Sequence, residues 1–539
     1  MERIENKVNN QMKDSNNVDY PDFDQMWSSI QQDELKVAGG EPVVLRPRKR
    51  KRFALVAGLS VALMATPVYA ALNYDWSSML SHREGIQSAL EQGLGQKIEQ
   101  SVTKEGVTLT VHTAFIDENR TVVLYSLKPE TSQDVTDIDF KLIGLKDSKG
   151  NFIEGHHGHK WNKDLGEFQG YFETDWVGKG QTADVEFIME NMRLFDNKKQ
   201  SISYNPNDST TQVFPIQKDG LDSVTLQSFE EAEGKVLLKS TVTLTDPELE
   251  SRWTNFEVIN DTVKSVEKAE GSSYLDGGAI LNQIFKSETL RKEGTKFRLS
   301  YDRILETKKS TWSINMNLSK KQLENGSFKQ VLDIPMDNVP GTKIHEMKVT
   351  PTQVRLKFTR DDHNAIPFKE YQLDVGGTLL DGYFMNIQPN EPELRFEMAG
   401  MDAAALANQP VTLVAKHRID GFYGDENDKP IHLTDISEKH QTATSSIAGY
   451  PISWTYYLKD NNLYVETLSS DPTFGGVDRT YYLDGKEQNL GRPEPNLTGS
   501  NKSIDVYKNF NKKELDIYIY SYAIEKPNEE LRIPLKSGK

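Results

Sequence analysis

The sequence contains no cysteine among its 539 residues. This absence excludes disulfide bonds, thiol catalysis and thiolate metal sites. The chain also lacks a P-loop, a G-x-S-x-G nucleophile elbow, an H-E-x-x-H zinc motif and a strand–G-x-G-x-x-G–helix unit. We therefore expect neither an enzyme of these classes nor a bound cofactor.

Basic side chains are outnumbered in this sequence. Lysine and arginine total 64 against 80 aspartate and glutamate residues, which gives a formal net charge of −16. Most of the excess negative charge lies after residue 72. A strongly acidic surface argues against nucleic acid, or any other polyanion, bound over a broad area.

Long apolar runs are also scarce, and the clearest is Phe53–Leu72. Its roughly 20 residues match the hydrocarbon thickness of a bilayer when they form a helix. Basic residues on one side mark that side as cytoplasmic, and they would lie against anionic lipid of the inner leaflet. The flanking basic residues are Arg48, Lys49, Arg50, Lys51 and Arg52. We expect a single-pass protein of the cell membrane with a cytoplasmic N-terminus and an extracellular C-terminal bulk.

A cleavable signal peptide is the alternative for this run. Val68–Ala70 offers a small-residue cleavage site after Ala70, and Pro67 could end the helix just before it. The segment that precedes the basic run is far longer than an ordinary signal-peptide n-region. We favour a retained anchor, and cleavage remains open.

The segment before the basic run has a helical pattern of its own. Its apolar residues recur at helical spacing and include a tryptophan, whereas a lone short helix is not stable in water without a partner. The residues of this stripe that we expect to bind a cytosolic partner are Phe23, Met26, Trp27 and Ile30. A helix lying on lipid is the alternative, which its acidic character disfavours.

The residues after the apolar run predict a mainly β protein. Trp76–Glu99 indicates a short helical stalk, and beyond it apolar residues alternate in short strands around polar turns such as Asp117–Asn119 and Thr350–Thr352. The pattern is typical of tandem antiparallel β-sandwiches of immunoglobulin-like type, lying outside the membrane after the cytoplasmic helix and one transmembrane helix. We expect Trp312–Met316 to close the second unit, and Ile517–Ile519 followed by Leu531–Ile533 to close the fourth.

These observations divide the chain into six parts. We expect a cytoplasmic segment with a short amphipathic helix in 1–45, the basic stop and transmembrane helix in 46–72, the stalk and first β-sandwich in 73–218, the second β-sandwich in 219–339, the third in 340–447, and a fourth β-rich domain in 448–539.

Three histidines form a local cluster, His156, His157 and His159. Neutral imidazoles can ligate a transition metal. His156 and His157 are adjacent, however, so in a strand they would point to opposite faces. Neighbouring glycines favour surface histidines without a metal, and we expect no metal site.

Four stretches carry a further pattern: Tyr20–Trp27, Arg48–Leu72, Gly93–Val102, and Gly106–Val111 with Asp117. Together they resemble a family of single-pass membrane proteins of Firmicutes, described as a domain of unknown function and often encoded beside extracytoplasmic-function sigma factors. Ile344–Ala399 is similar to a companion sandwich domain of such proteins.

The resemblance implies an anti-sigma-factor-like regulator. Its inner segment would hold a cytosolic sigma factor, and its outer modules would sense the envelope through an unknown ligand. The sequence departs from the zinc-binding anti-sigma pattern, because it has no cysteine and its first histidine is His82. The alternative is a cell-surface or cell-wall-binding structural protein without a signalling role.

Overall fold

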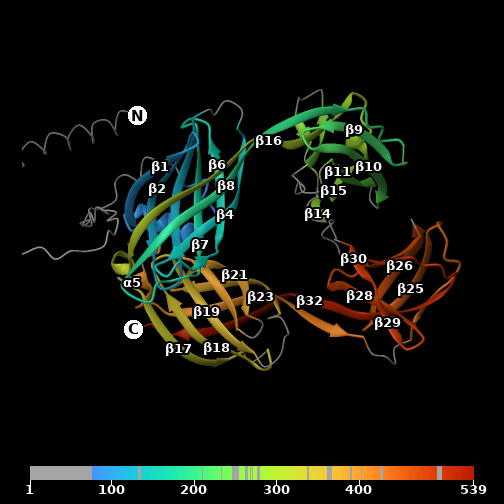
Figure 1. Cartoon of the computed structure of the whole chain (residues 1–539). Helices are drawn as coiled ribbons and strands as arrows, with labels where there is room; N and C mark the ends of the chain where they lie inside the picture. The colour runs from blue at the N-terminus through green and yellow to red at the C-terminus, as the bar shows by residue number, and fades with distance from the viewer. Residues whose placement is uncertain are drawn as a thin grey trace, which may run out of the picture. The chain divides into compact units, whose positions relative to one another are not determined.

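The computed structural model describes residues 76–130, 135–208, 210–231, 234–245, 254–260, 265–267, 269, 271–275, 280–336, 339–360, 367–388, 391–401, 403–424, 429–459, 461–494 and 501–538. These residues are mainly β and form several antiparallel sheets (Figure 1), as the sequence predicts. No helix within these ranges has the length and apolar composition needed to cross a membrane. The predicted apolar span, the basic run and the amphipathic stripe all lie outside the described residues.

The first module consists of two facing sheets. One sheet has the order β1-β2-β3-β7-β6. Its strands are β1 (Gln96–Lys104), β2 (Val107–Ile116), β3 (Thr121–Pro129), β7 (Glu167–Thr174) and β6 (His156–Asn162). The facing strands are β4 (Asp137–Asp147), β5 (Phe152–Ile153) and parts of β8 (Thr182–Ile202) and β16 (Thr295–Ser319). Apolar residues of both sheets, among them Leu109, Phe187 and Trp312, form one buried core.

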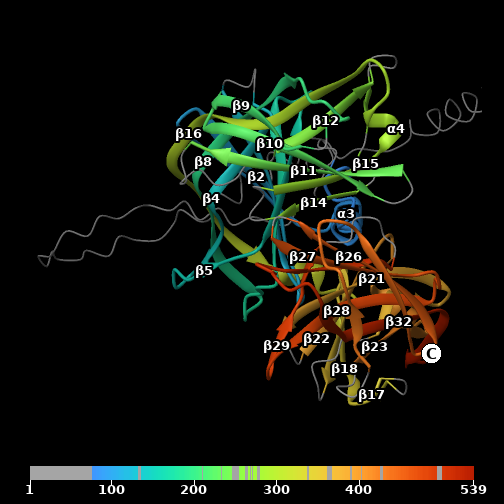
Figure 2. The ribbon, with the colours of Figure 1, turned by 90° about the vertical axis from the view of Figure 1, so that its right-hand side faces the viewer.

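The second module has its own core, which includes Leu226, Leu238 and Phe256. One sheet has the order β14-β15-β11-β10-β9, and Figure 2 shows several of these strands side by side. The elements are β9 (Gln212–Lys218), β10 (Leu221–Glu231), β11 (Lys235–Leu244), β14 (Gly271–Leu275), β15 (Ile280–Lys286) and α4 (Ser287–Leu290). This five-stranded sheet faces a second layer, formed by β12 (Thr254–Asn260), β13 (Ser265–Glu267) and the remaining parts of β8 and β16.

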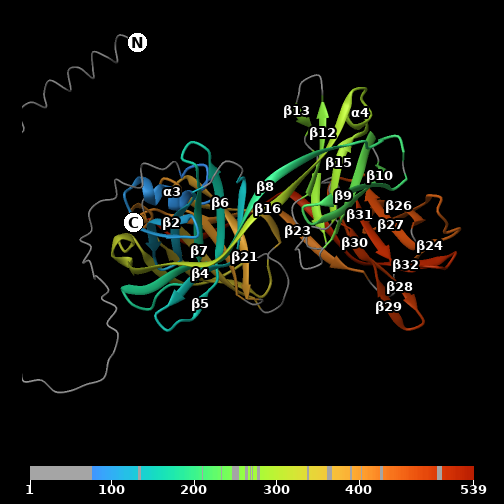
Figure 3. The same ribbon diagram turned by 45° about the horizontal axis from the view of Figure 1, so that its top comes forward.

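Strands β8 and β16 form a long ribbon that contributes to both cores (Figures 1 and 3). Near one end Phe297 pairs with Ile202 and packs in the second core. Further along, Trp312 pairs with Met189, and both side chains lie in the first core. The second module is therefore inserted between two strands of the first.

The insertion differs from the expected chain order. Trp312–Met316 was expected to close the second unit, but its apolar residues pack with the first. The alternating pattern correctly marks a strand with one buried face. It does not specify which sheet the strand joins, because that choice depends on residues more than a hundred positions away.

The second half of the chain repeats this arrangement. Leu356, Phe396 and Leu413 belong to the core of a third module, whose strands all belong to one sheet that continues through the last strand into the fourth module. Its elements are β17 (Phe328–Pro335), β18 (Thr342–Val349), β19 (Gln353–Arg360), β20 (Phe368–Val375), β21 (Thr378–Gln388), β22 (Glu391–Glu397), α5 (Ala403–Leu406), β23 (Val411–Tyr423) and part of β32 (Leu515–Lys536). The preceding η5 (Lys320–Leu323) packs its Leu323 in a small core with Trp76 and other residues of the first module.

The fourth module is inserted between β23 and β32. Its elements are β24 (Ile431–Leu433), β25 (Gln441–Ile447), β26 (Tyr450–Lys459), β27 (Asn462–Ser469), β28 (Phe474–Asp484), β29 (Glu487–Leu490), β30 (Arg492–Glu494) and β31 (Ser503–Tyr507). Within β32, Ile517 packs in the fourth core and Ile533 in the third. Ile517–Ile519 therefore belongs to the fourth module, as expected, whereas Leu531–Ile533 contributes to the third.

The expected stalk helix is shorter than predicted. Helix α3 (Glu84–Glu91) ends before Gly93 and Gly95, whose φ angles are +71° and +120°, and the chain then enters β1. Ile86 and Leu90 of α3 pack in a small core against the outer side of the first module's sheet. The helix is thus part of the first module rather than a free stalk.

Candidate functional site

The turn between β2 and β3 is ordered by an aspartate. The Oδ1 atom of Asp117 accepts hydrogen bonds from the backbone N–H of Asn119 (2.7 Å) and of Arg120 (2.9 Å). Such a side chain replaces a backbone partner and fixes the turn. The turn therefore holds Arg120 in a defined position at the end of the hairpin.

A second hairpin turn, between β18 and β19 of the third module, meets the first. Asn119 donates from Nδ2 to the carbonyl oxygen of Gln353 at 3.0 Å, and the Thr352 hydroxyl donates to Asp117 Oδ2 at 2.6 Å. Asp117, Thr352 and Gln353 are all at most 2% exposed. Two turns more than 200 residues apart thus form one buried polar contact, which we call the junction.

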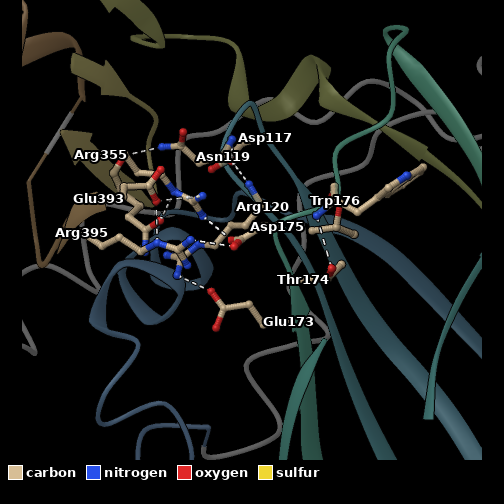
Figure 4. A network of polar contacts seen from close by, with 12 residues as sticks. Asp117, Asn119, Arg120, Glu173, Thr174, Asp175, Trp176, Arg355, Glu393 and Arg395 are labelled. Atoms are coloured by element: carbon tan, nitrogen blue, oxygen red, sulfur yellow. Dashed lines mark hydrogen bonds and ion pairs between the residues drawn. The ribbon is translucent and has the colours of Figure 1, made fainter. Parts of the chain in front are cut away.

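Arg120 lies at the centre of the junction (Figure 4), and its side chain is 1% exposed. Its Nε donates to the Thr352 hydroxyl and one Nη2 hydrogen to the Thr352 carbonyl, at 3.1 and 3.0 Å. The other three bonds go to carboxylates: Nη1 to Glu173 at 2.8 Å and to Glu397 at 2.9 Å, and Nη2 to Glu397 at 2.8 Å. All five guanidinium N–H donors are therefore used.

Both carboxylates have further donors. Glu173 of β7 accepts from Nε of Arg83 at 2.5 Å. Glu397 of β22 accepts from the backbone N–H of Gly85, in the first turn of α3, at 3.1 Å, and from Gln353 at 2.9 Å. A carboxylate at a helix N-terminus also interacts favourably with the helix dipole. The first module, its helix and the third module are linked through these two groups.

The electrostatics keep the junction ionised. Burial alone would raise the pKa of Glu173, but the charges of Arg120 and Arg83 and their hydrogen bonds outweigh it and lower this pKa to about 2. Burial would lower the pKa of Arg120, yet Glu397 and Glu173 raise it well above its usual value. Both groups are therefore charged at neutral pH.

A second ionic cluster adjoins the junction (Figure 4). Asp175, which follows β7, accepts from Arg355 of β19 at 2.8 Å and from Arg395 of β22 at 2.6 Å. Arg395 also donates to Glu393 at 2.7 Å. Burial would raise the pKa of Asp175, but the hydrogen bond from Arg395 and the charge of Arg355 lower it. This cluster is a further link between the two modules.

A cavity of about 460 Å³ lies beside these contacts. Residues of both modules line it: Glu118, Asn119, Asp175, Val177, Gly178, Lys179, Lys320, Lys348, Arg355, Lys357 and Glu393. Lys320 forms an ion pair with Glu118 at 2.8 Å, and Lys348 donates to the Glu118 carbonyl at 3.0 Å. The junction, which is itself a buried contact, therefore lies beside a polar pocket.

The three histidines considered as metal candidates lie on β6. His159 bonds to Asp137 through Nε2 at 2.9 Å, and its ring contacts Phe140 and Phe168 edge-on. His157 stacks on His159, with ring centroids 6.3 Å apart. Within the described residues, no group of histidine and acidic side chains is arranged to hold a metal ion.

The predicted partner-binding stripe and membrane-flanking residues are not brought into any described site. Phe23, Met26, Trp27 and Ile30 lie outside the described residues, as do Arg48–Arg52.

Sequence reasoning missed the junction, although it identified both turns as hairpin turns. Gln353 and Arg355 occupy the outward face of β19, opposite Val354 and Leu356, and alternation assigns such positions to solvent. In the structure Gln353 is fully buried and Arg355 is 6% exposed, because the first module covers this face. The sequence feature that could have pointed to the junction is the run Asp117–Arg120, in which a turn-forming aspartate is followed by an arginine.

Residues 46–129 match a family described as "Domain of unknown function (DUF4179)". The matched region contains several of the stretches that carry the resemblance noted above, and it includes Arg120. No curated protein matches the sequence.

Three solved structures show distant similarity. A conserved domain protein from Bacillus anthracis has 10% identity, covers 82% of this chain and 92% of its own, and has a TM-score of 0.32. A Ca²⁺-stabilised, ice-binding adhesin of an Antarctic bacterium has 10% identity, coverage of 77% and 92%, and a TM-score of 0.10. A xanthan lyase from Paenibacillus has 9% identity, coverage of 80% and 56%, and a TM-score of 0.10. Likenesses this low carry no argument about fold or activity.

Proposed function

We propose that this protein is a non-enzymatic, membrane-anchored regulator that senses the state of the cell envelope and binds a cytosolic partner, a sigma factor, through its N-terminal segment. In this proposal the amino end is cytoplasmic, Phe53–Leu72 crosses the membrane, and the four β modules lie outside.

The observation that carries the proposal is the extent of the family match. The matched residues begin at Arg46, in the basic run, and continue through the apolar run to Pro129, at the end of β3. One family unit therefore contains both the candidate membrane span and the hairpin that carries Arg120. This unit is suited to transmitting a conformational change at the junction to the membrane span.

The small number of residues between the predicted span and the first module supports the same proposal. Trp76, which is 4% exposed and packs with α3, follows the end of the apolar run by only four positions. A short connection limits how far the module can move independently of the span, whereas a long flexible linker would absorb such a movement.

The cytosolic partner is proposed from sequence alone. An acidic helix with an apolar stripe and a tryptophan is suited to docking in a groove of another protein. The stripe is small for a stable interface, since standard interfaces bury about 800 Å² per partner. Binding of a sigma factor would therefore require flanking residues of the inner segment to order as well.

The test is co-purification with the full-length chain in detergent. We expect the intact protein to retain a sigma factor from a lysate of the source cells, identified by mass spectrometry, and Trp27→Ala to lose it. Gln25→Ala is the matched control, because Gln25 lies on the opposite side of the same predicted helix. Equal recovery of the sigma factor with Trp27→Ala and Gln25→Ala would contradict the proposal, as would its absence from the intact sample.

A second experiment separates the regulator from a surface-binding protein. Residues 1–45 are replaced by an unrelated soluble tag, and the envelope phenotype is compared with that of a deletion strain. A regulator should behave like the deletion, whereas a surface-binding protein should behave like the wild type.

A further inference from the structure

The cavity beside the junction has a charge opposite to that of the whole chain. Its lining includes five cationic side chains, Lys179, Lys320, Lys348, Arg355 and Lys357, and three carboxylates, Glu118, Asp175 and Glu393. The pocket therefore has a formal surplus of two positive charges in a chain of net charge −16. Such a local reversal of sign concentrates anions.

The three carboxylates are already engaged by other cations. Glu118 pairs with Lys320, while Asp175 and Glu393 pair with arginines of the third module. Among the described residues, no carboxylate forms an ion pair with Lys179 or Lys357. Within the lining Lys320 cancels Glu118, and Arg355 with Asp175 and Glu393 leaves one negative charge. The surplus of two therefore comes from three lysines, Lys179, Lys348 and Lys357.

The pocket also contains a partly buried lysine that forms no ion pair with the pocket carboxylates. Lys348 donates to a backbone carbonyl rather than to a carboxylate in the pocket. Burial lowers the pKa of its ammonium group; the charges of Glu346 and Glu118 raise this pKa, and that of Lys357 lowers it, so that burial decides the direction. An anion placed beside Lys348 and Lys357 would stabilise the charged form of Lys348 against this burial.

We propose that this pocket binds a small dianion, inorganic phosphate or a free phosphomonoester, held by Lys179 of the first module and by Lys348 and Lys357 of the third. A dianion matches the surplus of two charges, whereas a phosphodiester of a lipid or polymer carries only one charge per phosphate. The guanidinium of Arg355 lines the pocket in a fixed position, because its donors are held by Gln353, Asp175 and Glu393.

The size of the pocket fits a small ligand. Its volume of about 460 Å³ falls in the range of ordinary small-molecule sites, roughly 300–1,000 Å³. Because cations of both modules would contact one anion, the bound ligand would strengthen the link that the junction already makes. The proposal concerns a ligand site and does not depend on the signalling role proposed above.

The test is isothermal titration calorimetry on the full-length chain in detergent, with inorganic phosphate and glycerol 3-phosphate as probes. We expect both to bind, and the double variant Lys179→Gln, Lys357→Gln to weaken binding about tenfold, since each solvent-accessible charge contributes roughly threefold. Lys508→Gln, an exposed lysine of the fourth module, is the control and should leave the affinity unchanged.

Further arms identify the source of the phosphate group. Acetate tests for unspecific attraction of anions, and vesicles of phosphatidylglycerol test for a lipid headgroup. The proposal is overturned if neither phosphate probe binds, if the double variant binds them as tightly as Lys508→Gln does, if acetate binds equally well, or if only the vesicles bind. Circular dichroism of each variant checks that the fold is retained.

Discussion

Replacing Arg120 by leucine is the sharpest test of the junction. Leucine removes the charge and all five donors while keeping an apolar side chain in the space. Glu173 would then retain Arg83, and Glu397 would retain Gly85 and Gln353, so neither carboxylate loses every partner. Breaking a buried ion pair by removing one partner costs about 3–5 kcal/mol.

The cost should appear as local opening of the two hairpins. A loss of about 3–5 kcal/mol raises the exchange rate of their protected amides by a factor on the order of 10²–10³ or more. Hydrogen–deuterium exchange with mass spectrometry measures this rate separately for the β2–β3 and β18–β19 turns. Because the increase should occur in both turns, the measurement also tests whether one contact holds them together.

The control is an arginine with a similar number of ionic partners but an exposed site. Arg532, whose side chain is 53% exposed, pairs with Glu530 and Asp374, so Arg532→Leu should change stability by less than about 1 kcal/mol. If Arg120→Leu raised amide exchange at the two turns no more than Arg532→Leu did, the junction would not be the contact that links the modules.

Three further predictions test the rest of the structure. The pKa of Glu173 is lowered from 4.5 to about 2, so the stability that its charged form contributes is present above pH 4.5 and is lost as the pH falls toward 2. Urea unfolding should show a decrease of about 3 kcal/mol in the free energy of unfolding over this range, and the variant Glu173→Gln should lack this contribution. Gly85→Ala should loosen the junction in hydrogen exchange, because its Cβ would lie 1.8 Å from a carbonyl oxygen of the third module, whereas Gly421→Ala, with open space around the Cβ, should not. Trp312→Ala should raise amide exchange in β2 and β3 rather than in β10 and β11, and Phe256→Ala should do the reverse, since the two side chains belong to different cores.

The β character of the chain could be predicted because it is a local property. Alternation of apolar and polar residues marks each strand, and Leu109, Val354 and Trp454 are buried as that pattern requires. Glycines at the turns mark where strands end. The end of α3 follows the same rule, since Gly93 and Gly95 adopt positive φ angles that most residues avoid.

The nested arrangement and the junction could not be predicted, because both depend on contacts between distant segments. Nothing in Trp312–Met316 itself selects β8 as its partner. Arg355 and Gln353 look like surface residues until another module covers them. The pocket lysines are likewise ordinary surface residues in the sequence, and their significance comes from the carboxylates that are already paired around them.

The insertion of one module inside another has a consequence for the order of folding. A ribosome delivers the part of β16 that joins the first core only after the residues of the second module, and the part of β32 that joins the third core only after those of the fourth. Each inner module can therefore close on contacts nearer in sequence while its host still lacks a strand. During synthesis, the second and fourth modules should therefore be able to fold before the first and third modules have received their last strand.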